Sequence, residues 1–260
     1  PLKGLRYRFN FGPDFRYYRN GTFRNEESIS SEGKNRASLS NQSDFSWTLD
    51  NLIYYDKEFG KHSVGLTLLQ SATGYHYEES SMAAEGIPLE SAKWNALSKE
   101  NVSLLDEWNS GLIEKQLLSY MFRVNYDYNN KYLLTVSSRW DGASQLAEGN
   151  KWAFFPSAAL GWRLDQEEFL KDVTWLNQLK FRLGVGVTGN SAIDPYQTKG
   201  AIVSLYYPFG SALAPGYAAS EPLIKDGAVA MANKNLSWEK TTQYNIGLDY
   251  SVLNGRISGV

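Results

Sequence analysis

Hydrophobic and polar residues alternate with a period of two along several segments of the chain. From Leu118 to Tyr128 the even positions hold only Leu, Tyr, Phe and Val, whereas the odd positions include Arg, Asn and Asp. Successive side chains of a strand point to opposite faces, so this segment predicts a strand with one apolar and one polar face. A tight turn at Asn129-Asn130 leads into a second alternating run from Tyr132 to Trp140, and the two runs predict a β-hairpin.

The same period recurs elsewhere and predicts eight strands and the start of a ninth. The other strands are expected over residues 5–11, about 44–58, about 62–75, 158–164, 179–187 and 244–252, with the ninth beginning after the Asn254-Gly255 turn.

The connections between these strands alternate in length. Short ones lie at Phe59–Lys61, Asn129-Asn130 and Asn254-Gly255, with one of intermediate length from Gln166 to Asn177, and long ones run over residues 12–43, 76–116, 142–151 and 189–241. In an up-and-down sheet every second connection falls on the same side, so all the long loops share one end. Long external loops and short periplasmic turns are typical of outer-membrane barrels. The pattern predicts an all-β fold, a segment of an antiparallel transmembrane β-barrel.

Aromatic residues are unusually abundant, at 14% of the chain, and 17 of them are Tyr and 8 are Trp. Several share the parity of the apolar face and fall near strand ends, where two bands would form lipid-interface girdles. These girdle candidates are Tyr126, Tyr128, Tyr132, Trp140, Trp152 and Trp162. A soluble β-sandwich with an aromatic core is the alternative, but the strands approach the ~9–11 residues of tilted membrane strands.

Composition narrows the class of protein further. The formal net charge is -2, which disfavours nucleic-acid binding driven by positive charge, and there is no cysteine for disulfides or thiolate metal sites. Mean hydropathy is -0.42, and the most apolar stretch, from Trp152 to Trp162, is interrupted by Pro156. We therefore expect no membrane-spanning helix, which leaves a membrane β-barrel open.

No motif predicts catalysis, a metal or a cofactor. Gly184 to Gly189 matches the G-x-G-x-x-G dinucleotide pattern, but strand alternation runs straight through it and no helix follows. Glu167-Glu168 resembles a glycosidase carboxylate pair, but adjacent side chains on an extended chain diverge, so we interpret it as solvated loop charge. Two histidines and no nucleophile motif make a catalytic triad improbable. We expect a protein that is not an enzyme, without metal or cofactor.

Two further sets of residues are candidates for binding. Loop aromatics could stack on sugars or pack against a partner or against the loops themselves, and we name Trp94, Trp108, Tyr206, Tyr207 and Tyr217. Charged residues of the polar face would line a barrel lumen and contact a plug, or would face water on a soluble sheet; these are Arg123, Asp127, Arg163, Lys180, Arg182 and Asp249, with Arg139 and Asp141 at the mouth.

Specific residues add a resemblance to a known family. The run from Lys131 to Ser144, KYLLTVSSRWDGAS, resembles a barrel segment of SusC/RagA-like TonB-dependent outer-membrane transporters. Similar motifs follow in the family's order: Phe155-Pro156-Ser157 with Gly161-Trp162, Glu168-Phe169, Leu179 to Arg182, Gly186 with Thr188 to Asn190, Asn235 to Glu239 and Gln243 to Asp249. The sequence departs from the family pattern after Gly142, where Ala143 and Leu146 replace the commoner serine and phenylalanine, a change expected to affect loop packing.

The resemblance implies a large plugged barrel of about 22 strands. Residues 1–260 are then expected to be a partial barrel domain without the plug domain and the C-terminal strands, from a longer gene product. It further implies an outer-membrane location, surrounding lipid, uptake of glycans or peptides, a SusD-like surface lipoprotein as partner and the TonB complex acting through the plug. It assigns no ligand-contact role to the loop aromatics or to Arg139 and Asp141. A soluble carbohydrate-binding or glycan-cleaving β-protein and a complete small membrane barrel remain the alternatives.

Overall fold

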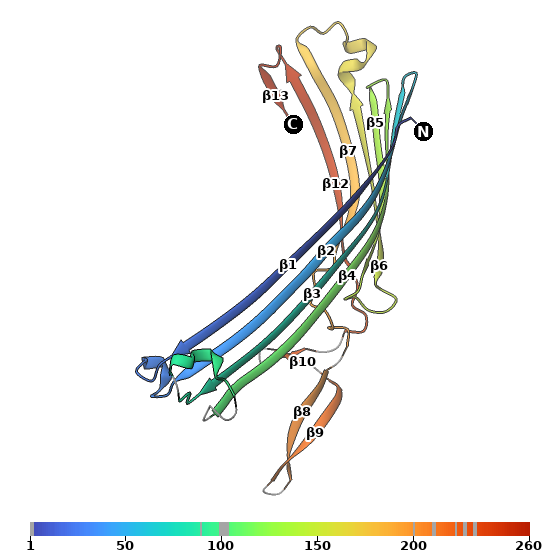
Figure 1. Ribbon diagram of the computed structural model, residues 1–260. Helices are drawn as coiled ribbons and strands as arrows, with labels where there is room; N and C mark the ends of the chain where they lie inside the picture. Colours follow the sequence, from blue (N-terminus) through green and yellow to red (C-terminus); the bar gives the residue numbers. More distant parts are fainter. Residues whose placement is uncertain are drawn as a thin grey trace. The chain divides into compact units, whose positions relative to one another are not determined.

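The computed structural model describes residues 3–88, 90–98, 104–199, 201–209, 212–221, 223–225, 228–230 and 233–260, and only the backbone at residue 30 and within 104–107 and 201–230. The chain is nearly all β. Its main strands are β1 (Leu5–Arg24), β2 (Arg36–Phe59), β3 (His62–Glu85), β4 (Leu104–Tyr128), β5 (Tyr132–Ala143), β6 (Trp152–Arg163), β7 (Leu176–Asn190), β12 (Glu239–Val252) and β13 (Ile257–Gly259) (Figure 1).

These nine strands form one antiparallel sheet in the order β1-β2-β3-β4-β5-β6-β7-β12-β13. β1 and β13 stand at its two ends, so the described sheet is open. Two small sheets lie between β7 and β12 in sequence: β8 (Ala201–Phe209) with β9 (Ala212–Glu221), and β10 (Leu223–Lys225) with β11 (Ala228–Ala230). The short 3-10 helices are η1 (Ile29–Ser31), η2 (Glu90–Asn95), η3 (Leu164–Gln166) and η4 (Glu168–Leu170). Among the described residues, none of the helices has the length and hydropathy needed to cross a membrane.

The chain divides into two compact units. Unit 1 comprises Pro1–Asn10, Leu49–Ala72 and Gln116–Val260, and unit 2 comprises Phe11–Thr48 and Thr73–Lys115. Unit 1 holds the β5, β6, β7 and β12 ladder, and unit 2 holds parts of β1 to β4.

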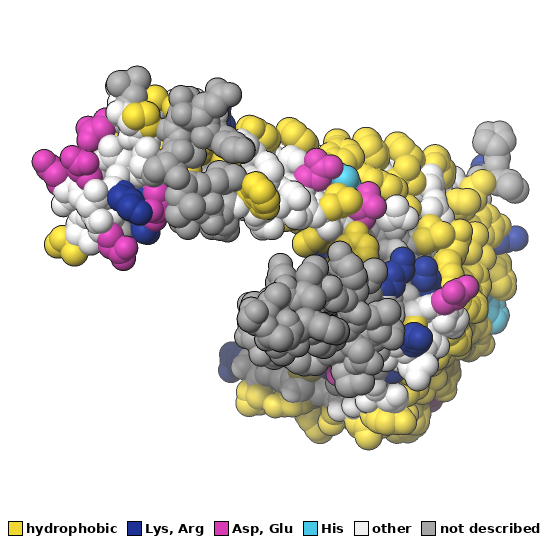
Figure 2. Space-filling model, turned by 90° about the horizontal axis from the view of Figure 1, so that it is seen from below, with side chains coloured by type: hydrophobic (Ala, Val, Ile, Leu, Met, Phe, Trp, Pro, Cys, Tyr) yellow, Lys and Arg dark blue, Asp and Glu magenta, His cyan; other side chains and the backbone are white. Residues whose placement is uncertain are grey.

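The predicted hairpin between β4 and β5 is confirmed, with Tyr128 opposite Tyr132 and Val124 opposite Val136. Its apolar face continues without interruption across unit 1, because Val136 pairs with Ala158, Ala158 with Val185, and Val185 with Tyr244. The side chains of this face are exposed: Val136 is 41% exposed, Val185 42% and Tyr244 81%. Figure 2 shows hydrophobic side chains gathered along one side of the sheet, with Lys and Arg side chains on the other.

An exposed apolar face disagrees with a soluble sandwich, in which these residues would form the core. Fully buried apolar residues are few and small, and most of those in unit 1 lie near the loops that join β5 to β6 and β7 to β12. The sheet therefore requires an apolar environment on one face, as the barrel prediction requires.

The strands are longer than the alternation predicts. Residues 12–43 and 76–116 were expected to be loops, but β1 runs on to Arg24, β2 begins at Arg36, β3 ends at Glu85 and β4 begins at Leu104. In the extensions of β2, β3 and β4 both faces carry polar side chains, so apolar alternation stops there, while backbone pairing needs no such pattern. In β1 the alternation continues through Phe15 to Tyr17, beyond the predicted end of the strand at Phe11. The loop prediction at 142–151 comes close, because β5 ends at Ala143 and β6 begins at Trp152.

Pro156 lies inside β6, which begins six residues before the predicted strand. Pro156 pairs with Ser138 of β5, but pairing of β6 with β7 starts only at Ser157. A proline lacks an amide proton, and it is tolerated where a strand has no partner on one side. The glycine-rich segment from Gly184 to Gly189 lies within β7 as predicted, so no nucleotide-binding turn forms there.

Candidate functional site

The polar face of unit 1 contains an open groove of about 660 Å³. Glycines widen it: Gly65, Gly161 and Gly184 all line its wall, and a Cβ atom on Gly184 would meet no atom closer than 3.8 Å. Its polar lining includes Asp127, Lys180 and Arg182, together with amides and hydroxyls from neighbouring strands. Such a surface can hold another polypeptide segment close to the sheet through charge pairs and hydrogen bonds.

Ion pairs fix several charges of this face. Arg182 of β7 pairs with Asp249 of β12 at 2.6 Å, and Arg163 pairs with Asp165 at 2.8 Å. Asp127 has a structural partner as well, since its Oδ1 accepts a hydrogen bond from the backbone amide of Asn130 at 2.7 Å. The Asp127 carboxylate therefore caps the β4–β5 turn, where Asn129 and Asn130 both have positive φ. Arg123 is exposed, and Lys180 is half-buried.

At the loop end of the face, Arg139 and Asp141 form a tight pair. Arg139 Nε lies 2.7 Å and 2.9 Å from the two oxygens of Asp141, and its Nη2 donates to Ser119 Oγ at 3.1 Å. Asp141 is 7% exposed, whereas 42% of the Arg139 side chain is exposed. A ligand would therefore meet the Arg139 guanidinium more readily than the Asp141 carboxylate.

Beside this pair lies a small apolar cluster, the loop-end core, formed by Ala143, Leu146, Ala147, Ala153 and Phe155 with Trp238. All but Trp238 are at most 7% exposed. Trp238 meets the Phe155 ring edge-on at 5.2 Å and donates from Nε1 to the carbonyl of Lys151. A Cβ on Gly189 would overlap the Phe155 ring, so this position needs glycine. Leu146, where the sequence departs from the family pattern, lies in this packed core.

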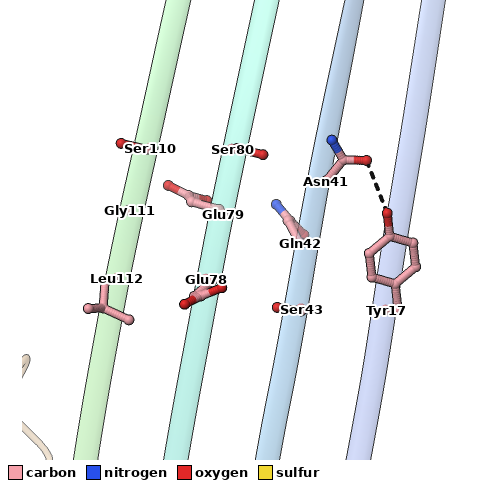
Figure 3. A pocket seen from close by; sticks show the side chains of 10 residues that line it. All are labelled: Tyr17, Asn41, Gln42, Ser43, Glu78, Glu79, Ser80, Ser110, Gly111 and Leu112. Atoms are coloured by element: carbon pink, nitrogen blue, oxygen red, sulfur yellow. Dashed lines mark hydrogen bonds between the residues drawn. The ribbon is translucent and has the colours of Figure 1, made fainter.

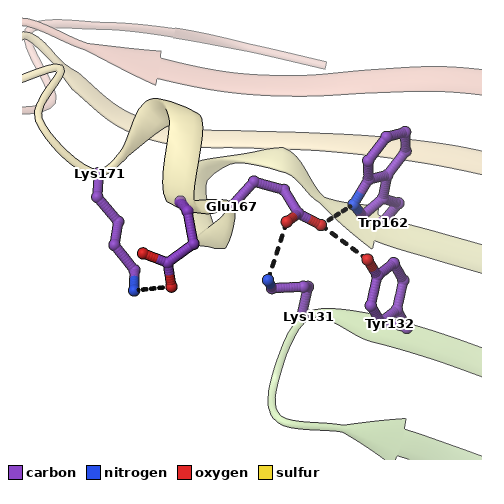
Figure 4. A network of polar contacts seen from close by, with 6 residues as sticks. Lys131, Tyr132, Trp162, Glu167 and Lys171 are labelled. Atoms are coloured by element: carbon purple, nitrogen blue, oxygen red, sulfur yellow. Dashed lines mark hydrogen bonds and ion pairs between the residues drawn. The ribbon is translucent and has the colours of Figure 1, made fainter.

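At the opposite end of the strands, one carboxylate gathers three donors. Glu167 accepts hydrogen bonds from Lys131 Nζ at 2.9 Å, Tyr132 Oη at 2.8 Å and Trp162 Nε1 at 2.9 Å (Figure 4). We call these four residues the turn-end network. The side chains of Lys131 and Glu167 are only 16% and 14% exposed. The prediction that Glu167 is solvated loop charge is therefore wrong; it holds for Glu168, which is exposed and pairs with Lys171.

The network shifts the ionisation of its members. Hydrogen bonds from Lys131, Trp162 and Tyr132 lower the pKa of Glu167 to about 2, against an ordinary value of 4.5. The same contact with Glu167 raises the pKa of Lys131. Both charges are thus stabilised, and nothing in this arrangement provides the half-ionised group that acid–base catalysis needs at neutral pH.

The girdle candidates form two bands. Tyr128, Tyr132 and Trp162 stack in series at the turn end, with centroid distances of 6.3 Å and 6.4 Å. At the loop end, Trp152 stacks on Tyr120, and Trp140 packs against Phe154 at 4.6 Å. Tyr126 joins the turn-end band through a 2.7 Å contact between its hydroxyl and His62 Nδ1. Their place at a lipid boundary stays a prediction.

The loop aromatics are not brought together. In unit 2, Trp94 lies on η2 and covers Gly21, where a Cβ would overlap the indole, and Trp108 is 79% exposed on β4. The packing of Trp94 indicates a structural role, whereas Trp108 is free to contact a partner. Tyr206, Tyr207 and Tyr217 belong to β8 and β9, but their side chains lie outside the described part of the chain.

Comparison with known proteins identifies the family. A match to the family described as TonB dependent receptor-like, beta-barrel, covers residues 2–259. The chain belongs to the TonB-dependent receptor-like β-barrel family. The resemblance to SusC/RagA-like transporters and the prediction of a barrel segment are thereby confirmed, and membership of this family implies an outer-membrane location.

Individual relatives agree with this family assignment. The TonB-dependent receptor SusC of Bacteroides thetaiotaomicron is 34% identical over 273 residues, which cover 97% of this chain and 25% of the relative. The TonB-dependent receptor P3 of Formosa agariphila is 33% identical over 211 residues, covering 80% of this chain and 20% of the relative. The chain thus spans a quarter or less of these receptors.

Solved structures show the same fold at lower identity. The RagAB peptide transporter superposes with a TM-score of 0.83 at 22% identity, covering 99% of this chain and 27% of that one. The RagAB peptide importer in its "open-open" state gives 0.83 at 23% identity, with the same coverage. The strand arrangement of this segment is therefore also found in the RagAB structures.

Proposed function

We propose that this chain is part of an outer-membrane TonB-dependent importer of large nutrients, either glycans or peptides. One observation carries the proposal: a continuous, exposed apolar face on strands whose opposite face is polar and grooved. That combination suits a wall with lipid on one side and a hydrated, occupied lumen on the other. Family membership and the SusC relative support the transport role.

The polar-face groove then receives the plug. Its glycines allow close approach of a second backbone, and its charges offer pairs to the plug surface. Arg123, Asp127, Arg163, Lys180, Arg182 and Asp249 are the proposed lumen-facing residues. Among them Asp127, Lys180 and Arg182 line the groove, and Lys180 is the best plug contact, because Asp127 is engaged by its own turn and Arg182 by its ion pair with Asp249.

The proposed partners are a SusD-like surface lipoprotein at the long-loop end and the TonB complex, which would act through the plug. Trp108 is the strongest candidate for contact with the lipoprotein or with nutrient, since its indole is exposed and has room for a partner. Arg139 is proposed as a polar contact at the lumen mouth. Tyr206, Tyr207 and Tyr217 stay candidates on sequence grounds. Transport of this kind needs no covalent catalysis, and we propose no catalytic, metal or cofactor site.

Growth on defined nutrients tests the proposal. The gene is deleted, and the strain is complemented with the full-length wild-type protein, with Lys180→Ala/Arg182→Ala, or with Lys57→Ala as a control on an exposed cation outside the groove. We expect the deletion to abolish growth on one class of polymer and to spare growth on its monomers, with the double variant impaired and the control normal. Normal growth of the deletion strain on every glycan and peptide tested would refute an import role.

Affinity purification from solubilised membranes tests the partner. We expect a surface lipoprotein to copurify with the wild-type protein and to be recovered in smaller amounts with Trp108→Ala. Purification of the receptor without any lipoprotein would contradict the proposed partnership while leaving import itself untouched.

A further inference from the structure

A second groove, of about 550 Å³, lies in unit 2 on four adjacent strands (Figure 3). Tyr17 of β1 and Leu112 of β4 form its two edges, and they are 60% and 50% exposed. Amide and hydroxyl side chains from β2, β3 and β4 form the floor between them, among them Asn41, Ser80 and Ser110. We call this the edge-strand groove.

Strand parity assigns this groove to one face of its own strands. Ser110 and Leu112 are even-numbered like Tyr120 and Tyr126, the apolar-face residues of the same strand, β4. Contacts between β3 and β4 keep one register along both strands, since His62 meets Tyr128 and His76 meets Glu114. The edge-strand groove therefore lies on the side to which the even-numbered side chains of β4 point, and it shares no lining residue with the polar-face groove proposed for the plug.

The groove is organised before any ligand binds. The Tyr17 hydroxyl donates to Asn41 Oδ1 at 3.2 Å, which fixes the direction of the ring. On the same face, Glu78 Oε1 lies 3.2 Å from His76 Nε2, which holds its carboxylate. Glu79 points to the opposite face of β3, where its carboxylate accepts hydrogen bonds from Tyr77 Oη at 2.6 Å and from Asn109 at 3.4 Å. Side chains already held in position lose little entropy on binding.

The lining chemistry selects a class of ligand. Glu78 is the one carboxylate whose side chain faces the groove, because Glu79 points to the opposite side of β3, and none of the lining residues is Lys or Arg. An anionic ligand would meet repulsion without compensation. The Glu78 carboxylate is engaged by His76 Nε2 at 3.2 Å, so most of the available groups are uncharged. An aromatic edge with a floor of amides and hydroxyls suits a ligand that combines apolar C–H faces with many hydroxyl groups.

We propose that the edge-strand groove binds neutral oligosaccharides and rejects sulfated, phosphorylated or uronic ones. The sugar ring packs on Tyr17, and its hydroxyls exchange hydrogen bonds with Asn41, Ser80 and Ser110. The inference rests on the proposed outer-membrane location, which exposes this surface to glycans. Such oligosaccharides have two sources: free nutrient glycans and the sugar headgroups of outer-leaflet glycolipids.

A glycan array tests the proposal with the full-length protein in detergent. The array carries neutral gluco-, manno-, xylo- and galacto-oligosaccharides, their uronic and sulfated counterparts, chitosan oligomers and delipidated headgroup oligosaccharides. We expect binding to neutral oligosaccharides alone, and the headgroup spots reveal which source is preferred. Absence of neutral binding, or equal binding of anionic or chitosan oligomers, would overturn the proposal.

Variants then locate the binding. Ser110 is exposed, so Ser110→Trp fills the groove without disturbing the fold, and we expect a loss of affinity of at least roughly tenfold. Glu90→Trp, on exposed η2 outside the groove, is the control and should bind normally. Tyr17→Ala should weaken binding by roughly tenfold and Tyr17→Phe by less, because phenylalanine keeps the ring. Unchanged affinity of Ser110→Trp would place the binding elsewhere and refute the assignment. The growth assay tests the proposed import, whereas the glycan array tests binding in the edge-strand groove. Either proposal can therefore be refuted without refuting the other.

Discussion

The two ends of the unit 1 strands are stabilised by different interactions, polar at the turn end and apolar at the loop end. At the turn end, one carboxylate satisfies three polar donors, and the residues that meet it are a lysine and two exposed-face aromatics. At the loop end, the contacts are apolar: Phe155 packs among alanines, Leu146 and Trp238, and a glycine makes room for its ring. Both ends anchor connections, yet only the loop end resembles a protein core.

The difference follows from the lengths of the connections at the two ends. The turn between β4 and β5 is three residues long, and the connection from β6 to β7 is joined to it by the contact between Glu167 and Lys131. The connections at the loop end are longer, and they bring residues 144–151 against residues 233–238, where Ala147 N donates to Leu236 O and Asn150 donates to Asn235 O. Long connections lose more conformational entropy on ordering, and burial of apolar surface offsets that loss.

The strongest test of the comparison removes the centre of the loop-end core. Phe155→Ala should lower the free energy of unfolding by about 3–5 kcal/mol, because a buried aromatic ring leaves a cavity. Phe154→Ala is the matched control, since Phe154 is the next residue, points to the other face and is 41% exposed. Urea unfolding of the full-length protein in lipid vesicles, followed by heat-modifiable gel mobility, measures both. Equal losses for the two variants would show that the loop end is not a core.

A second test distinguishes the two faces of one strand. Val185→Arg places a charge in the middle of the apolar face and should cost about 2–4 kcal/mol in lipid. Thr188→Arg lies on the polar face of the same strand and should cost clearly less. The same unfolding assay in vesicles gives the comparison. If both variants unfold alike, the apolar face does not contact lipid.

Removal of one charge tests the turn end. Glu167→Gln keeps the shape of the side chain but loses the ion pair with Lys131, so the turn end should open more readily to protease and urea while the loop end stays protected. Glu168→Gln removes the neighbouring exposed carboxylate, which makes only a surface pair, and should change little. Limited proteolysis with mass spectrometry locates the cleavage. Equal sensitivity of the two variants to protease and urea would show that Glu167 does not stabilise the turn end.

The smallest effect is a dependence on acidity. Because the folded-state pKa of Glu167 is lowered to about 2 from an ordinary 4.5, its contribution to stability is fully present above pH 4.5. That contribution is lost as pH falls from 4.5 through about 2, where the folded carboxylate becomes protonated. Stability of the wild type should therefore drop more steeply over this range than that of Glu167→Gln, as measured by urea midpoints at a series of pH values. Parallel profiles would show that the pKa is not lowered.

Sequence reasoning succeeded where a strand separates lipid from a polar interior. Between Leu118 and Val187, the alternation correctly predicted the apolar and polar faces of the strands, the hairpin and the fold class. Period-two alternation can be recognised locally, because a strand with lipid on one side needs apolar residues at every second position. It failed in the extensions of β2, β3 and β4, where both faces are polar and strand pairing leaves no apolar pattern, and it ended the first strand at Phe11 although the alternation continues to Tyr17. The edge-strand groove was missed for that reason, since Tyr17, Asn41 and Ser80 fell within segments expected to be loops.

The sequence by itself determined the two-faced strands, the absence of a catalytic motif and the family, since each depends on residues adjacent or alternating along the chain. Only the tertiary structure decided which charges are free. Glu167, Asp127 and Asp141 all look like solvent-facing carboxylates in sequence, but each is held by a donor: Asp127 by its own turn, Asp141 by Arg139 of the same strand, and Glu167 by Lys131, Tyr132 and Trp162. The partners of a side chain across a sheet depend on strand register and loop packing, which bring together residues far apart in the chain, such as Lys131 and Glu167, 36 positions apart.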